Sequence, residues 1–196
     1  MRQSRQRGRL FAAAAAVFAR VGYAEASAEA IAREAGMSKA TFYEHFANKE
    51  ECIVALFDTA TEIVLDAMRD AAARDTATDP QARVHATLGA FLGTLAHYQN
   101  ESQTLLVEIV GAGPRALERR DRALEAVAQY LEELNAEDAE RGATPRLQPH
   151  DAFAIVGAAV ELASRQIRTG VPADIGELEP VIERLTLGLM AAGDGP

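Results

Sequence analysis

The sequence predicts an all-α fold of about nine helices. Alanine, leucine, glutamate and arginine, which favour helices, dominate its 196 residues. No stretch shows the sustained alternation of apolar and polar residues that marks a half-buried strand. Apolar residues instead recur at steps of three and four, which is the spacing of one face of a helix. Glycines, prolines and capping residues divide this pattern into separate helices.

The first helix is expected over about residues 5–21 and ends at Gly22. The basic and alanine-rich start also resembles the first regions of a secretory signal. We favour an amphipathic helix, because its apolar residues fall at helical steps and Arg20 interrupts the segment. A single cysteine, Cys52, and the lack of an apolar run of membrane-spanning length favour a cytoplasmic location without a membrane partner.

Two short helices with serine caps follow. Ser27 precedes a helix over about 28–35, and Ser38 precedes a helix that reaches Phe46. A serine oxygen at these positions accepts the free N–H groups of a helix start. Gly36 permits a tight turn between the two helices, since glycine adopts positive φ at no steric cost. This arrangement predicts a helix-turn-helix.

Further helices are predicted along the rest of the chain. They are expected over about 48–74, 80–97, 101–110, 114–140, 150–169 and 177–192, with a break at Asp75–Asp79. The last two helices are apolar on more than one face, which favours burial on both sides. We interpret the second face as a subunit interface, the alternative being that other helices of the same chain cover it. The residues chosen for this interface are Phe153, Val156, Val160, Ile167, Val181, Leu185 and Leu189.

The net charge of −9 is unevenly distributed along the chain. Residues 1–50 carry eight basic and five acidic side chains, a net charge of +3, whereas the other 146 residues carry 12 basic and 24 acidic side chains, a net charge of −12. This asymmetry indicates a basic module on an acidic body. The N-terminal arginines are interpreted either as an extension that contacts DNA or as a solvated terminus.

The segment SKATFYEHFANKE at 38–50 favours contact with DNA. Phe42 and Phe46 lie four residues apart and are expected in the core, which leaves the opposite face exposed. An α-helix fits the major groove, where lysine, threonine and tyrosine contact bases or phosphates. The alternative is an ordinary amphipathic surface helix. The residues expected to contact DNA are Ser27, Ser38, Lys39, Thr41, Tyr43, His45 and Lys49, with Ser27 and Lys49 on phosphates.

About residues 5–57 resemble the DNA-binding domain of the tetracycline-repressor (TetR) family of bacterial transcriptional regulators. The matching features are Phe18, Gly22 and Tyr23, the pair Ile31–Ala32, the AGMS at 35–38, and TFYEHF at 41–46 with Lys49. The resemblance implies a homodimer without a cofactor, with a DNA-binding domain over 1–47 and an effector-binding and dimerisation domain over 48–196. It further implies a repressor that a small molecule releases from a palindromic operator.

The same resemblance places an effector pocket among the fourth to eighth helices. The candidates by location are Phe57, Thr61, Met68, Phe91, Tyr98, Glu108 and Tyr130, most of them expected to be ordinary core. Glu108 stands out, because apolar neighbours surround its carboxylate and a buried charge needs a partner or a function. The alternative for Glu108 is an ion pair with Arg115 or Arg119.

Two other function classes are alternatives to a regulator. One is a helical-bundle enzyme that uses Glu108, and the other is an interaction protein with a vestigial helix-turn-helix. The four histidines are far apart in the sequence, and no HExxH, P-loop or GxSxG motif is present. We therefore expect neither a metal site nor enzyme activity.

Overall fold

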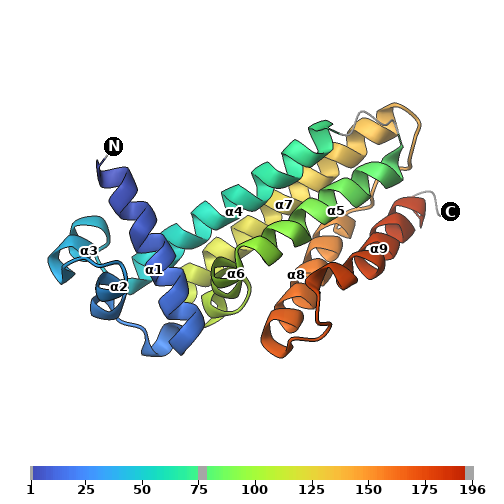
Figure 1. The fold of residues 1–196 in the computed structure, drawn as a ribbon. Coiled ribbons are helices and arrows are strands. Elements are labelled where there is room, and N and C mark those ends of the chain that lie inside the picture. Colours follow the sequence, from blue (N-terminus) through green and yellow to red (C-terminus); the bar gives the residue numbers. More distant parts are fainter. Residues whose placement is uncertain (1, 75–78, 193–196) are drawn as a thin grey trace. The chain divides into compact units, whose positions relative to one another are not determined.

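The computed structural model describes residues 2–74 and 79–192. Within these ranges the fold contains nine α-helices, two short 3-10 helices and no strand (Figure 1). The predicted fold class is confirmed. The expected break at Asp75–Asp79 lies outside the described residues except for Asp79, whose carboxylate accepts a hydrogen bond from the Gln81 N–H at 3.2 Å. In the described ranges, no helix is both long and apolar enough to cross a membrane.

The chain forms two compact units, the first of which comprises Met1–Glu62 and Tyr98–Asp121. Within unit 1, α1 packs against α2, α6 and η1, and α2 packs against α3. Its elements are α1 (Arg2–Glu25), α2 (Ala28–Glu34), α3 (Lys39–His45), the start of α4 (Lys49–Arg74), α6 (Gln99–Leu106), the 3-10 helix η1 (Glu108–Gly111) and the start of α7 (Pro114–Glu140). The domain boundary expected near residue 47 stays a prediction.

The second unit comprises Ile63–His97 and Arg122–Pro196. In this unit α9 packs on both α5 and α8. Its elements are the remainder of α4 and of α7, α5 (Pro80–His97), α8 (Asp151–Thr169), the 3-10 helix η2 (Ile175–Leu178) and α9 (Glu179–Ala191). Its apolar interior includes a cluster of buried Val64, Leu65, Met68 and Tyr130, against which Phe91, Val127, Leu131 and Leu134 pack.

The expected helix ends agree with the structure at most positions. Gly22 has φ 78° and ψ 160° and interrupts the helical backbone, although the helix is assigned onward to Glu25. The helix predicted over 101–110 was wrong, because α6 ends at Leu106 and the non-helical Val107 separates it from η1. Local sequence signals therefore located the helices better than the short irregular segments between them.

The two faces expected on the last helices differ in burial. Phe153 is 43% exposed, and Val181 and Leu185 are also exposed, whereas Ile167 and Leu189 are half-buried. Val156 and Val160 are buried within the single chain, and the subunit interface stays a prediction. The predicted interface residues that are exposed to solvent are Phe153, Val181 and Leu185.

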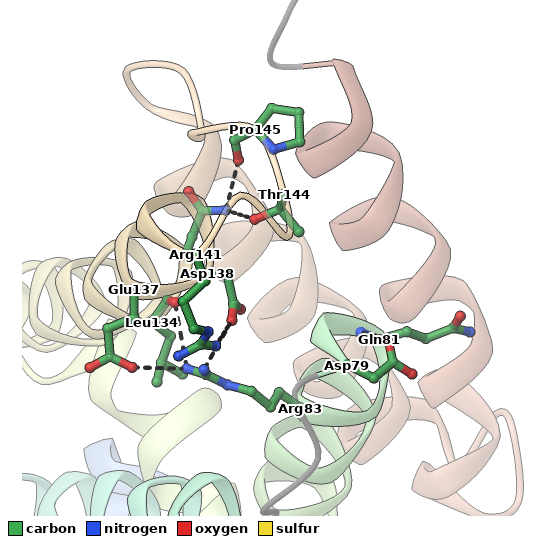
Figure 2. Close-up of polar contacts among 10 residues, drawn as sticks. Asp79, Gln81, Arg83, Leu134, Glu137, Asp138, Arg141, Thr144 and Pro145 are labelled. Carbon is green, nitrogen blue, oxygen red and sulfur yellow. Dashed lines mark hydrogen bonds and ion pairs between the residues drawn. The ribbon is translucent and has the colours of Figure 1, made fainter.

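A buried ionic network joins α5 to the end of α7 in unit 2 (Figure 2). Nη1 of Arg83 donates to Oδ1 of Asp138 at 3.0 Å, and both side chains are buried. Glu137 also pairs with Arg83, and Arg141 donates to Asp138. The two arginines and two acids satisfy one another, which buried charges require.

Candidate nucleic-acid interface

Both predicted serine caps are confirmed. The Ser27 hydroxyl oxygen accepts from the Ala30 N–H at 3.1 Å, and the Ser38 hydroxyl oxygen accepts from the Thr41 N–H at 3.1 Å. Ser38 and Thr41 also share a hydrogen bond between their hydroxyls, with the oxygens 3.0 Å apart. These bonds satisfy N–H groups that a helix start leaves free, and they fix where α2 and α3 begin.

The two faces of α3 are separated as the sequence predicts. Phe42 and Phe46 are fully buried, with ring centroids 5.5 Å apart. On the other side, Lys39 is exposed and Tyr43 is 50% exposed, its ring edge-on to Phe42. The aromatic anchors thus hold α3 to unit 1 while polar side chains stay outside. Contact between those side chains and DNA remains a prediction.

The remaining α3 candidates are less exposed than expected. Thr41 and His45 are half-buried. Lys39 forms an ion pair with Glu29, in which Nζ of the lysine is 3.7 Å from the carboxylate. Both side chains of this pair are largely exposed. An exposed pair of this kind contributes little, about 0–1 kcal/mol, so Lys39 can leave it for a phosphate at small cost.

Two N-terminal arginines contribute to the packing of the module. The Arg7 guanidinium lies 5.3 Å from the ring centroid of Phe11 and 5.4 Å from that of Phe46. Nη2 of Arg9 donates to the Ala35 carbonyl at 2.5 Å. Arg7 and Arg9 are exposed but are tied to the module by these contacts, and contact between the N-terminal arginines and DNA stays a prediction. Both residues belong to the first turns of α1 and contact the helix-turn-helix from its surface.

Lys49 is placed differently from the phosphate contact that the sequence predicts. Its ammonium lies 4.5 Å from the Tyr23 ring centroid and donates to three carbonyls at and after the end of α1. The acceptors are the oxygens of Tyr23 (2.8 Å), Ala24 (2.9 Å) and Ala26 (3.0 Å). An ammonium has three N–H donors, and all three are used here. Lys49 therefore caps the end of α1, and its contact with a phosphate stays a prediction.

Glu108 also serves the end of α1. Its Oε2 accepts from the Tyr23 N–H at 2.8 Å, and its Oε1 accepts from Nε2 of Gln103 at 3.1 Å. The alternative of an ion pair with Arg119 was wrong, because Arg119 makes a two-point contact with Asp58, at 3.0 and 2.5 Å. That contact raises the pKa of Arg119 above its ordinary value. Glu108 thus accepts a hydrogen bond from a main-chain N–H near the end of α1.

The other effector candidates divide between the two units. Met68, Phe91 and Tyr130 meet in the apolar cluster of unit 2, whereas Phe57, Thr61 and Tyr98 belong to unit 1. Among these residues Tyr98 is exposed, at 41%. Three of the candidates thus pack together within unit 2, and the effector pocket stays a prediction.

Tyr130 has a buried hydroxyl without a hydrogen-bond partner among the described residues. Burial raises its pKa, which the nearby Arg69 and Arg83 oppose. Thr87 on α5 also has a buried hydroxyl oxygen without a partner in the described ranges, and the sequence analysis did not single it out. An unsatisfied buried hydroxyl costs about 1–3 kcal/mol. Both hydroxyls are in unit 2 and have unused hydrogen-bonding capacity.

The residues in 2–74 and 79–192 contain no group of three or more histidine, cysteine or acidic side chains placed to hold a metal ion. Cys52 is fully buried, and burial raises the pKa of its thiol to about 12. A thiol in this environment stays protonated and unreactive at neutral pH. The candidate site in unit 1 therefore consists of the serine caps, the buried rings of Phe42 and Phe46, and the exposed polar side chains of α3.

Residues 10–56 match the bacterial regulatory proteins of the tetR family. The matched region comprises most of α1, all of α2 and α3, and the start of α4. The HTH-type transcriptional activator FasR of Mycolicibacterium smegmatis is 35% identical to it over 92 residues, which are 47% of this chain and 41% of FasR. The matched part thus spans less than half of the length of this TetR-type relative.

Solved structures share the TetR-family fold over nearly the whole chain. The fatty acid degradation regulator FadR from Bacillus halodurans has a TM-score of 0.82 at 21% identity, covering 93% of this chain and 95% of FadR. FadR from Bacillus subtilis, solved in complex with stearoyl-CoA, has a TM-score of 0.77 at 17% identity, covering 95% and 98% of the two chains. In the region that matches the tetR family, α2 and α3 form the helix-turn-helix.

Proposed function

We propose that the protein is a ligand-responsive transcriptional regulator, a repressor that binds a palindromic operator as a homodimer and is released by a long-chain acyl-CoA. The observation that carries the DNA-binding part is the arrangement of α3. Phe42 and Phe46 anchor it, while Lys39 and Tyr43 project from its outer face. A helix presented in this way can enter the major groove with its polar side toward the base edges.

The homodimer is supported by the exposed apolar residues of the last helices. Phe153 on α8 and Val181 and Leu185 on α9 are large apolar side chains left in contact with solvent. A symmetric dimer buries such a surface against a second copy of itself. The two copies of α3 would then contact half-sites one helical turn of DNA apart, about 34–36 Å, or a multiple of that distance.

The acyl-CoA part is supported by unit 2. Its cluster around Met68 and Phe91 supplies apolar side chains suited to a hydrocarbon chain. The unpaired hydroxyls of Thr87 and Tyr130 supply donors suited to a carbonyl oxygen, such as that of a thioester. The B. subtilis FadR structure holds stearoyl-CoA on a similar fold. The hydrocarbon chain and the thioester carbonyl of an acyl-CoA match these two properties.

Selection of binding sites from a random duplex library tests the proposal. We expect the purified protein to enrich a palindromic motif, with affinity falling steeply as salt rises because phosphate contacts release counterions. Added stearoyl-CoA is expected to weaken binding to that motif. Dimers that enrich no sequence, with or without stearoyl-CoA, would favour an interaction protein, and turnover of stearoyl-CoA would favour an enzyme. Either outcome would overturn the proposal.

A further inference from the structure

Near its C-terminal end, α1 has a kink at Gly22, three residues before the helix ends at Glu25. Gly22 adopts φ 78°, a conformation that favours glycine, and so turns the N–H of Tyr23 out of the helical hydrogen-bond pattern. A part-buried main-chain N–H without a partner is costly. In unit 1 that partner is the Glu108 carboxylate, 85 residues further along the chain. The turn therefore depends on a side chain from η1.

Glu108 is itself held in place for this contact. Gln103 on α6 donates to the second carboxylate oxygen, so both oxygens have partners. A carboxylate that accepts a main-chain N–H makes a charge-assisted bond, roughly twice as strong as a neutral one. On the other side of the same residue, Lys49 donates to the Tyr23 carbonyl at 2.8 Å. Two charged side chains of opposite sign thus fix the Tyr23 main chain.

We propose that Glu108 is a positioning residue for DNA binding: its carboxylate sets the turn between α1 and α2 and thereby the placement of the helix-turn-helix. This inference rests on the proposed function. Glu108 does not contact DNA in this role. Its effect passes through the Tyr23 main chain into α2, which packs against α3. The α6–η1 segment then contributes to DNA binding by supplying Glu108 and the Gln103 side chain that holds it.

Two substitutions test the role of the carboxylate. Glu108→Ala removes the acceptor, and Glu108→Gln keeps an oxygen acceptor but no charge. We expect Glu108→Ala to weaken binding to the selected operator roughly tenfold, equivalent to about 1.4 kcal/mol, with little effect on non-specific DNA affinity. Glu108→Gln is expected to restore most of the operator affinity. Glu118→Gln, at an exposed position of α7 in the same unit, is the matched control and should change neither quantity.

Hydrogen exchange of the Tyr23 amide gives a readout that does not need DNA. Exchange should accelerate at least tenfold in Glu108→Ala and stay close to the native rate in Glu108→Gln, because only the alanine variant loses the acceptor. Equal operator affinity and equal Tyr23 exchange in the alanine variant would overturn the inference. Equal losses of specific and non-specific DNA affinity would also overturn it, since they would indicate general damage. If the native protein binds no operator, the proposed function fails, and the amide exchange alone decides whether Glu108 sets the turn.

Discussion

Arg83 and Asp138 face each other across the interior of unit 2, with Nη1 of the arginine 3.0 Å from Oδ1 of the acid. They lie 55 positions apart in the sequence and come from α5 and α7 (Figure 2). Next to them, Nδ2 of Asn135 donates to the Thr144 hydroxyl and the Pro145 carbonyl, which holds the loop after α7. The network closes this end of unit 2 through polar rather than apolar contacts.

We expect Asp138→Ala to destabilise the protein by about 3 kcal/mol, because breaking a buried pair leaves a charge without its partner. Glu137 stays within 3.2 Å of Arg83 and keeps the loss at the lower end of the usual range. Urea unfolding measures the change. Asp70→Ala, which removes only an exposed pair with Arg74, is the control and should cost less than about 1 kcal/mol. Equal losses in both variants would contradict the role of the network.

Lys49 and Lys39 should differ in how they affect DNA binding. Lys39→Ala is expected to lower operator affinity and to reduce the slope of log affinity against log salt by about one, as for a phosphate contact. Lys49→Met should leave that slope unchanged and instead lower the free energy of unfolding by about 1–3 kcal/mol, because three carbonyls lose their donor. Salt titrations of operator binding and urea unfolding distinguish the two lysines. A reduced slope in Lys49→Met would restore the phosphate contact predicted from the sequence.

Tyr43 and Phe42 are neighbours with opposite expected effects. Tyr43→Ala should weaken operator binding by about 1–3 kcal/mol, the range for a lost base contact, and leave folding intact because the side chain is 50% exposed. Phe42→Ala removes a fully buried ring and should cost about 3–5 kcal/mol of folding stability. Band-shift titration and thermal unfolding give the two values. Unchanged DNA affinity in Tyr43→Ala would refute the assignment of α3 as the recognition helix.

The unused hydroxyls of unit 2 give a test of effector binding. Tyr130→Phe and Thr87→Val remove hydroxyls that have no partner in the described ranges, so each should leave the free energy of unfolding unchanged or slightly raised. Each should weaken stearoyl-CoA binding about fivefold, equivalent to about 1 kcal/mol for a lost hydrogen bond. Isothermal titration with stearoyl-CoA measures the affinity. Native-like affinity in both variants would show that the hydroxyls do not contact this ligand.

Cys52 links folding stability to alkaline pH. Its pKa is raised from 9.0 to about 12 by burial, so the folded protein keeps the thiol proton over a range in which the unfolded chain loses it. The thiol's contribution to stability is therefore complete below pH 9 and is lost as the pH rises toward 12. Urea unfolding at a series of alkaline pH values should show this decline in the native protein and a shallower one in Cys52→Ala. The same decline in both proteins would contradict the expectation.

Residues whose role depends on their immediate neighbours were predictable from the sequence. The caps at Ser27 and Ser38, the helix opening at Pro80 and the buried face of α3 all follow from signals within a few positions. The contacts of Lys49 and Glu108 with the end of α1 could not be predicted, because these main-chain partners lie 23 to 85 positions away. The burial of Val156 within the single chain could not be predicted, because two apolar faces of one helix look alike in the sequence until the rest of the fold shows which face is covered.

Unit 1 is discontinuous in the chain, and this affects the order in which it can be completed during synthesis. Its first segment ends at Glu62, and the residues that finish its packing run from Tyr98 to Asp121. At the usual rate of about 5–20 residues per second, a ribosome needs several seconds to release the second segment after the first. During that interval the Tyr23 N–H has no carboxylate to bind, and α1 lacks the α6 surface. The first helices to be translated can thus complete their packing in unit 1 only after more than half of the chain has been synthesised.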